Sequence, residues 1–301
     1  MKVAIASGKG GTGKTTLAVN LALVAGGPVR VFDCDVEEPN CHLFLHPKDL
    51  QEEPMCVLVP FVDDSRCVGC GECSRFCAFN AIVPAGTRTL VFAELCHSCG
   101  GCAKVCDAGA ITEIPRRIGS VLSGSCGAVR LIWGVLDVGE ASSPPVVRAV
   151  KRLPGAEELS IIDCPPGSSC PMIAAIRGSD FVVLVTEPTP FGLHDLTLAV
   201  AAVREIGLPC GVVINRADVG DERVVRYCHD EGLPVLLSIP DDRAIAEACS
   251  RGRAVVDVIP KMRRVFSRLL QRIREEEAAA VHARGPDVPP RRVRRRESRD
   301  T

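Results

Sequence analysis

Short apolar runs alternate with stretches of amphipathic helical spacing along most of this chain. The apolar runs predict strands at residues 2–6, 29–34, 129–136, 159–164, 181–186, 210–215 and 235–239. Apolar positions three or four residues apart predict helices at residues 15–24, 145–152, 194–206, 222–231, 243–251 and 261–280. This alternation is typical of an α/β fold with a doubly wound, mainly parallel sheet.

One segment interrupts the pattern. From residue 66 to residue 106 the chain is dense in Cys and Gly, and two similar halves follow each other at a spacing of about thirty residues. We therefore expect a discontinuous α/β domain at residues 1–61 and 114–280, with a small α+β domain inserted at residues 62–113. Residues 281–301 are rich in Pro and Arg without apolar periodicity, which predicts a disordered basic tail.

Composition narrows the function. The chain has 301 residues, 47% of them hydrophobic, 4% aromatic, and a formal net charge of −1, so we expect no nucleic-acid partner. The first residues carry no signal-peptide pattern, and no apolar run approaches the roughly 20 residues that span a bilayer. The 17 cysteines therefore favour a cytoplasmic protein whose thiolates bind metal over a secreted disulfide scaffold.

A glycine-rich loop follows the first predicted strand and opens the first predicted helix. It reads Gly-Lys-Gly-Gly-Thr-Gly-Lys-Thr-Thr at residues 8–16 and fits the phosphate-loop pattern G-x-x-x-x-G-K-[ST]. Backbone N–H groups of such a loop wrap around phosphate oxygens, and the helix N-terminus adds partial positive charge. We expect Lys14 to reach the β- and γ-phosphates of ATP and the Thr15 hydroxyl to bind Mg²⁺. The residues expected to hold the nucleotide in this loop are Gly8, Lys9, Gly10, Gly11, Thr12, Gly13, Lys14, Thr15 and Thr16.

A second lysine early in the loop, Lys9, distinguishes it from an ordinary phosphate loop. In this respect the chain resembles the deviant Walker A family that includes MinD, ParA, Mrp-like proteins and the nitrogenase iron protein. The resemblance implies that ATP binding joins two copies into a homodimer and that Lys9 reaches the partner's phosphates. It also implies slow, magnesium-dependent hydrolysis that acts as a switch.

The same resemblance assigns roles to residues outside the loop. In VFDCDVEEPN, Asp35 matches the residue that orients the attacking water, and Asp33 matches a structural or magnesium-linked carboxylate of the first switch. Asp163 resembles the Walker B aspartate behind Mg²⁺, and Gly167 resembles the second-switch glycine that faces the γ-phosphate. The expected adenine-side residues are Asn215, Arg216, Pro240 and Asp242.

The cysteine-rich segment contains one spacing twice. Each run is C-x2-C-x2-C-x3-C, the bacterial ferredoxin pattern, in which the fourth cysteine of one run ligates the other cluster. Two zinc sites fit this spacing less well. We therefore expect two 4Fe–4S clusters, one held by Cys67, Cys70, Cys73 and Cys106, the other by Cys96, Cys99, Cys102 and Cys77. Asp107 stands where ferredoxins usually carry proline, and its charge is expected to lower the potential of the nearby cluster.

The whole combination resembles MinD-superfamily ATPases with an inserted two-cluster ferredoxin domain. Two roles stay open: assembly or transfer of iron–sulfur or metal cofactors, and ATP-gated electron transfer, each with a redox or metal-cofactor client. The alternative is a spatial organiser of the MinD/ParA kind that uses the insert for docking or redox sensing. MinD also ends in a membrane-targeting helix, but we expect residues 261–280 to pack on the sheet and not to anchor the chain stably in a membrane.

Overall fold

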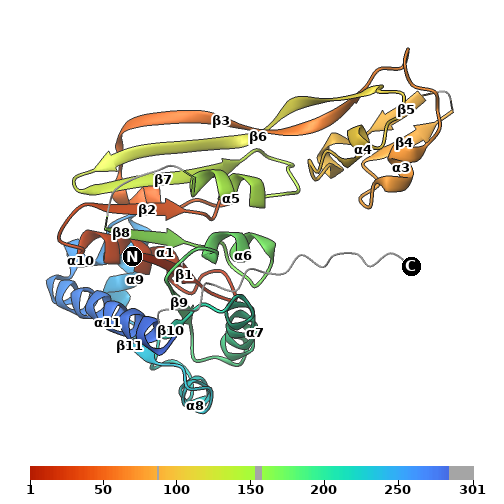
Figure 1. The fold of residues 1–301 in the computed structure, drawn as a ribbon. Helices are drawn as coiled ribbons and strands as arrows, with labels where there is room; N and C mark the ends of the chain where they lie inside the picture. The colour runs from red at the N-terminus through yellow and green to blue at the C-terminus, as the bar shows by residue number, and fades with distance from the viewer. Residues whose placement is uncertain (87, 153–157, 285–301) are drawn as a thin grey trace.

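The computed structural model describes residues 1–86, 88–152 and 158–284. Within these residues one sheet has nine strands in the order β11-β10-β9-β1-β8-β2-β7-β6-β3 (Figure 1). Its parallel part consists of β1 (Lys2–Ala6), β2 (Val29–Asp33), β7 (Val129–Leu136), β8 (Leu159–Asp163), β9 (Phe181–Thr186), β10 (Cys210–Asn215) and β11 (Val235–Ile239). These are the predicted strands, with ends that agree to within one residue. The carboxyl ends of all seven meet along one edge of the sheet.

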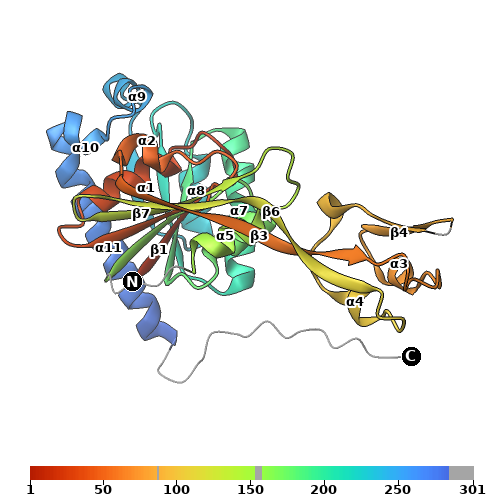
Figure 2. The ribbon, with the colours of Figure 1, turned by 90° about the horizontal axis from the view of Figure 1, so that it is seen from above.

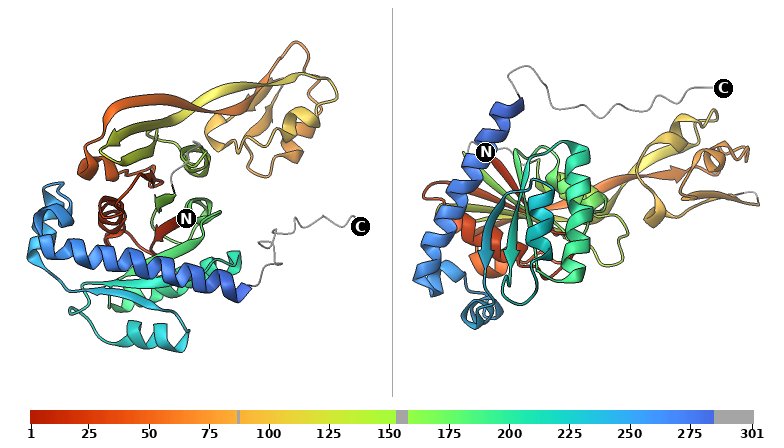
Figure 3. Two further views of the ribbon diagram at one scale, coloured as in Figure 1. Left: turned by 60° about the vertical axis from the view of Figure 1, so that its left-hand side comes forward. Right: turned by 90° about the horizontal axis from the view of Figure 1, so that it is seen from below.

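Helices cover both faces of this parallel part, which confirms the doubly wound architecture. One face carries α1 (Lys14–Leu23), α2 (Cys41–Leu45), α10 (Val255–Val258) and α11 (Pro260–Arg284). The other carries α5 (Pro144–Val150), α6 (Cys170–Ile176), α7 (Pro190–Ile206) and α8 (Arg223–Asp230). The short helix α9 (Arg243–Ser250) lies beside α10. Figure 3 shows α11 crossing its side of the sheet as one long helix.

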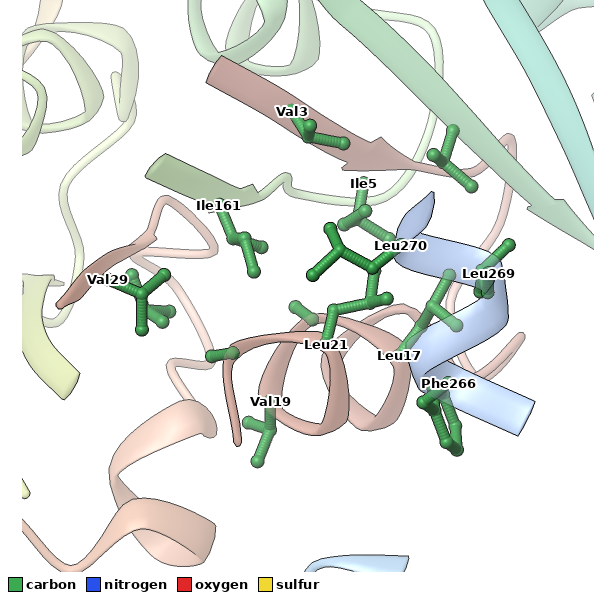
Figure 4. Packing of buried hydrophobic residues seen from close by; sticks show 14 of the residues in the cluster. Val3, Ile5, Leu17, Val19, Leu21, Val29, Ile161, Phe266, Leu269 and Leu270 are labelled. Carbon is green, nitrogen blue, oxygen red and sulfur yellow. The ribbon is translucent and has the colours of Figure 1, made fainter. Parts of the chain in front are cut away.

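The apolar stripe of α11 is part of the core. Phe266, Leu269 and Leu270 are at most 4% exposed and pack with Leu17 and Leu21 of α1 over β1 (Figure 4). Burying one such side chain contributes about 1.5–3 kcal/mol, so the stripe fixes the helix to the sheet as predicted. None of the described helices has the length and apolarity that crossing a membrane requires.

The end of α11 corrects one boundary. The helix runs to Arg284, so residues 281–284, assigned to the disordered tail, form its last turn. The preceding residues 275–280 are Glu and Ala, which have high helix propensity, and the helix continues from them through this turn. The rest of the predicted tail, 285–301, lies outside the described residues.

Two long strands were not predicted. β3 (Lys48–Val62) and β6 (Ile111–Cys126) pair antiparallel, and β6 adds to β7 at the edge of the sheet. Their far halves leave the body of the molecule as a ribbon (Figure 2). Most residues of β3 are exposed, and the first half of this strand is polar, so it lacks the alternation of apolar and polar positions that marks a half-buried strand. The apolar run at residues 55–59 was a usable signal that sequence reasoning missed.

The cysteine module, residues 63–110, lies at the end of this ribbon (Figure 1). It contains α3 (Glu72–Phe76), β4 (Ile82–Ala85), β5 (Arg88–Val91), the 3-10 turn Ala93–Leu95 and α4 (Gly101–Lys104). β4 and β5 form a separate antiparallel pair. The Phe76 ring lies on Gly101, where an added Cβ would come within 1.9 Å of the ring. This close approach sets the packing of α3 against α4.

Candidate nucleotide and metal sites

The phosphate loop connects β1 to the N-terminus of α1 at the carboxyl edge of the sheet. Gly13 precedes the helix with φ of 96°, a conformation that favours glycine, and no side chain caps the first turn. Gly8 packs against the main chain of α7, where an added Cβ would lie 2.3 Å from the Asp195 carbonyl oxygen. The loop therefore presents uncapped helix N–H groups, the arrangement that binds phosphate.

The predicted magnesium residues meet beside this loop. Asp163, at the end of β8, is 1% exposed, and burial raises its pKa to about 6 against the lowering effects of the Thr15 hydroxyl and Lys14. One carboxylate oxygen, Oδ2, accepts a hydrogen bond from the Cys41 thiol at 3.5 Å. The other, Oδ1, is buried and has no hydrogen-bond partner among the described residues. A buried carboxylate oxygen without a partner, next to a hydroxyl and a lysine, fits a site for Mg²⁺.

Asp33 lies beside Asp163 but its oxygens already have partners. Oδ1 accepts from the backbone N–H of Asp35 at 3.1 Å, and Oδ2 accepts from those of Asn40 and Cys41 at 2.9 Å each. Burial and then the neighbouring Asp163 raise the pKa of Asp33 to about 7. Of the two readings left open by the sequence, this geometry favours the structural one: Asp33 shapes the turn of the first switch.

Cys41 was not predicted at this site. Its sulfur lies with carboxylate oxygens of Asp33 and Asp163 in a group within 4.8 Å, and all three residues are buried. Thiolates are soft ligands that Mg²⁺ does not prefer, so Asp163 carries the fit to a magnesium ion and the Cys41 thiol acts as a hydrogen-bond donor. Cys41 lies eight residues after the end of β2, at the start of α2, so its position left no sequence signal.

Both switch segments are bonded to their neighbours. In the first switch, the carbonyl of Val36 accepts the N–H of Leu136 at the end of β7 at 2.8 Å. In the second, Gly167 has φ of 96° and its N–H donates to the Ser7 carbonyl at the start of the phosphate loop at 3.0 Å. Burial and the charge of Asp33 raise the pKa of Asp35 to about 6. Asp35 thus lies near Lys14 of the phosphate loop, and a carboxylate with this raised pKa is suited to orienting a water molecule.

The predicted adenine-side residues line one cavity of about 190 Å³ next to the loop. Asn215, Arg216, Pro240 and Asp242 share its wall with Gly11 and Gly13, and apolar side chains of α9 and α11 form its floor. The Asn215 amide donates to the Thr12 carbonyl at 2.9 Å. Asp242 caps α9 by accepting the Ala244 N–H at 2.8 Å. The cavity is apolar on one side and polar on the other, as a nucleobase site requires.

Lys9 is held by its own chain. Its ammonium nitrogen lies 2.8 Å from the Glu187 carboxylate, which is 9% exposed and also binds the Arg216 guanidinium at 3.2 Å. Glu187 therefore joins the early lysine of the loop to the base side of the site. Sequence reasoning missed Glu187, although an acid directly after the strand β9 was a usable signal, since strand ends meet at this edge.

The cysteine module brings the two runs together. Cys67, Cys70 and Cys73 line one small cavity with Cys106, the last cysteine of the second run. Backbone N–H groups point at the sulfurs: Ala81 at Cys77, Ser98 at Cys96 and Ala110 at Cys106, each at 3.4 Å. Left-handed backbone at Gly69, Gly71 and Gly100 turns the chain around the sulfurs. Four thiols around one cavity with N–H···S bonds fit a 4Fe–4S cluster.

The second run is also compact. Burial raises the pKa of Cys102, and the charges of Cys96 and Cys99 raise it further, so the three sulfurs lie within electrostatic range of one another. Cys70 and Cys99 are the exposed cysteines of the two runs, and the other six are partly buried. Each run therefore has one exposed cysteine and three that are partly buried.

The sequence is similar to those of a known nucleotide-binding family. The CobQ/CobB/MinD/ParA nucleotide binding domain family matches residues 3–256. The chain belongs to this family. The uncharacterized protein MJ0578 of Methanocaldococcus jannaschii is 29% identical over 279 residues, 91% of this chain and 97% of that protein. An iron-sulfur cluster carrier protein of Aquifex aeolicus is 25% identical over 275 residues, 84% of this chain and 61% of that protein.

Among solved structures, the septum site-determining protein MinD of Pyrococcus horikoshii, complexed with Mg-ADP, has a similar fold. Its TM-score is 0.57 at 22% identity, over 93% of this chain and 98% of that one. Membership of the MinD/ParA family confirms the expected class of fold, a P-loop nucleotide-binding domain. The family match, residues 3–256, includes the phosphate loop, Asp35, Asp163 and Asn215.

Proposed function

We propose that this chain is a slow, magnesium-dependent ATPase of the deviant Walker A type that carries two 4Fe–4S clusters. ATP closes a homodimer, and the closed state changes how the cysteine module reacts with a redox or metal-cofactor client. One observation carries the proposal: Cys106 of the second run lines the cavity of the first run, on a chain that also assembles a phosphate loop, carboxylates and a base cavity.

The nucleotide half needs little covalent chemistry. Lys14 and the loop N–H groups hold the phosphates, and Thr15 with Asp163 holds Mg²⁺. Asp35, with its raised pKa, orients the attacking water. The Lys9–Glu187 contact must open before Lys9 reaches a partner's phosphates, so Glu187 holds the lysine in the single chain. Positioning and charge stabilisation of this kind suit a switch better than a fast enzyme.

The cluster half is supported by the donor set. Cys67, Cys70, Cys73 and Cys106 would hold one cluster, and Cys96, Cys99, Cys102 and Cys77 the other. When bound, the clusters supply one-electron chemistry or iron and sulfide for transfer. The name of the Aquifex aeolicus relative, an iron-sulfur cluster carrier protein, favours a role in cluster handling.

Two experiments separate the versions of this proposal. Protein purified anaerobically is first analysed for iron and for ATP binding, with Lys14→Ala as the variant expected to lose nucleotide. Reduced protein is then mixed with an oxidised ferredoxin and, separately, with an apo-ferredoxin, with and without ATP.

Electron transfer that depends on ATP supports the gated donor, and cluster transfer to the apo-protein supports the carrier. If neither depends on ATP while the module still binds clusters, the MinD/ParA-like organiser becomes the better account. Retained hydrolysis in Lys14→Ala contradicts the assignment of the site.

A further inference from the structure

The second cysteine run lies beside the strand β6, which leads back to the body of the molecule. α4, which follows Gly100, packs against β6. A Cβ added at Gly100 would lie 3.4 Å from a carboxylate oxygen of Glu113 on β6. Three residues further along β6, Arg116 lies within electrostatic range of Cys96 and Glu94.

Arg116 is bound tightly to a loop of the nucleotide domain. Its Nη1 and Nη2 lie 2.5 and 2.7 Å from the two carboxylate oxygens of Glu140, and the side chains are 23% and 13% exposed. A two-bond pair of this geometry is both stronger and more specific in direction than a surface ion pair. Glu140 lies in residues 137–143, between the carboxyl end of β7 and α5.

The loop that carries Glu140 is connected to the first switch. At its start, the Leu136 N–H donates to the Val36 carbonyl, next to Asp35. Two residues earlier, a Cβ added at Gly134 would lie 2.6 Å from Val36. Val36 therefore packs directly on the end of β7, and together with the hydrogen bond this contact couples a shift of Val36 to that strand end. One turn later, the Glu140 N–H donates to the Asp137 carbonyl at 3.2 Å, which ties the carboxylate-bearing residue to the same loop.

The charge arrangement gives this connection a consequence for a bound cluster. With Glu140 in place, the positive charge of Arg116 is neutralised close to Cys96. If Glu140 moves away, Arg116 loses its hydrogen-bonded carboxylate and keeps only the longer-range attraction of Glu94, so more of its positive charge acts on the second cluster. A nearby positive charge stabilises the reduced, more negative cluster and raises its potential.

We propose that the Arg116–Glu140 pair is the positioning link through which the first switch controls the second cluster, the one expected on Cys96, Cys99, Cys102 and Cys77. Binding of MgATP draws the first switch toward the nucleotide, moves Glu140 away from Arg116, and raises the potential of that cluster. This inference rests on the proposed function, because it requires both nucleotide and clusters.

The neighbouring ion pair is a matched control. Arg117 binds Asp137 of the same loop, with its Nε 3.1 Å from the carboxylate, and also contacts Ser120. The two side chains are 54% and 37% exposed, more than those of the Arg116 pair. Arg117→Gln therefore removes the same type of contact between the same strand and loop.

The test is protein-film voltammetry on the full chain loaded with both clusters, with and without a non-hydrolysable ATP analogue and Mg²⁺. The electrode supplies the electron that reduces each cluster. We expect the nucleotide to raise the potential of one cluster in the unmodified protein and in Arg117→Gln. Without nucleotide, Glu140→Gln should raise that potential and Arg116→Gln should lower it. The double variant should return near the original value but lose the response to nucleotide.

Opposite shifts from the two single variants are a signature that loss of structure alone does not give. The inference is overturned if both single variants shift the cluster potential in the same direction. It is also overturned if the double variant keeps the response of the potential to nucleotide, or if Arg117→Gln loses that response as well. Iron content and nucleotide affinity are measured on the same samples. If both are intact and the potentials ignore nucleotide, the inference fails alone; if clusters or nucleotide do not bind, the proposed function fails with it.

Discussion

The parallel sheet and the cysteine module are stabilised in opposite ways. The sheet is enclosed by two apolar clusters of fully buried side chains. In the module, Ala81, Ile82 and Ala110 are the buried apolar side chains among the described residues. Six of its larger apolar residues, by contrast, are 42–74% exposed; they are Val68, Phe76, Phe79, Leu90, Phe92 and Leu95. A core this small does not offset the entropy of ordering about fifty residues, so we expect the module to depend on the clusters that its cysteines are proposed to bind.

Removal of the clusters should therefore have the largest effect. Anaerobic treatment with a strong iron chelator is expected to abolish hydrogen-exchange protection in residues 63–110, because metal binding supplies the folding free energy of such small domains. Protection in β1, β8 and β9 should persist. Hydrogen exchange measured by mass spectrometry checks both regions at once. A module that stays protected without iron would show that its side-chain packing is sufficient.

Core truncation should separate the two regions next. Phe266→Ala removes a side chain that is 1% exposed in α11, and should lower the free energy of unfolding by about 3–5 kcal/mol. Phe92→Ala removes one that is 42% exposed in the module, and should cost less than about 1 kcal/mol. Urea unfolding of the cluster-loaded protein measures both. Similar losses would contradict the contrast between an apolar core and a ligand-held module.

The buried carboxylates predict a pH dependence of the sheet region. The pKa of Asp163 rises from an ordinary 3.8 to about 6 in the fold, so its contribution to stability is present below pH 4 and lost as pH rises through 6. Without nucleotide or Mg²⁺, Asp163→Asn should therefore gain about 1–3 kcal/mol at pH 7.5 and nothing at pH 4. Adding MgATP should stabilise the unmodified protein and not the variant. Thermal unfolding across this pH range measures the difference; a gain independent of pH would contradict the assignment of the charge.

The smallest expected effect is at Glu187. Glu187→Gln loosens the contacts to Lys9 and Arg216 and should lower the protein concentration needed for ATP-driven dimerisation about three- to tenfold. Glu231→Gln, which loosens a surface pair with Arg204, is the control and should change nothing. Sedimentation velocity with MgATP measures both. A weaker dimer in Glu187→Gln would show that Glu187 supports assembly and does not restrain Lys9.

The same contrast explains what the sequence predicted. The strands and helices of the parallel sheet were readable because burial on one or both faces imposes an apolar pattern, as in 181–186 and in the stripe of α11. The ribbon of β3 and β6 was missed because most of β3 is exposed and its first half is polar, so only the run at residues 55–59 is apolar. Short helices such as α2 and α6 are set by tertiary contacts, and they have too few turns for periodicity to show.

For the site, motif spacing predicted which residues gather at the sheet edge, because parallel strands end there together. Spacing did not reveal contacts between side chains from distant segments. The Lys9–Glu187, Cys41–Asp163 and Arg116–Glu140 pairs each join positions at least 24 residues apart. Pairs of this kind depend on the folded geometry.

The central claim, that nucleotide controls the module, is tested most directly by the reactivity of the clusters. Anaerobically purified protein with both clusters is mixed with a ferrous chelator, and the rate of iron release is measured with no nucleotide, with MgADP and with MgATP. If each of the two clusters releases its iron in a separate kinetic phase, the account predicts that MgATP changes the rate of one phase. Lys14→Ala should abolish this change. Identical rates under all three conditions, in protein shown to bind ATP, would contradict it.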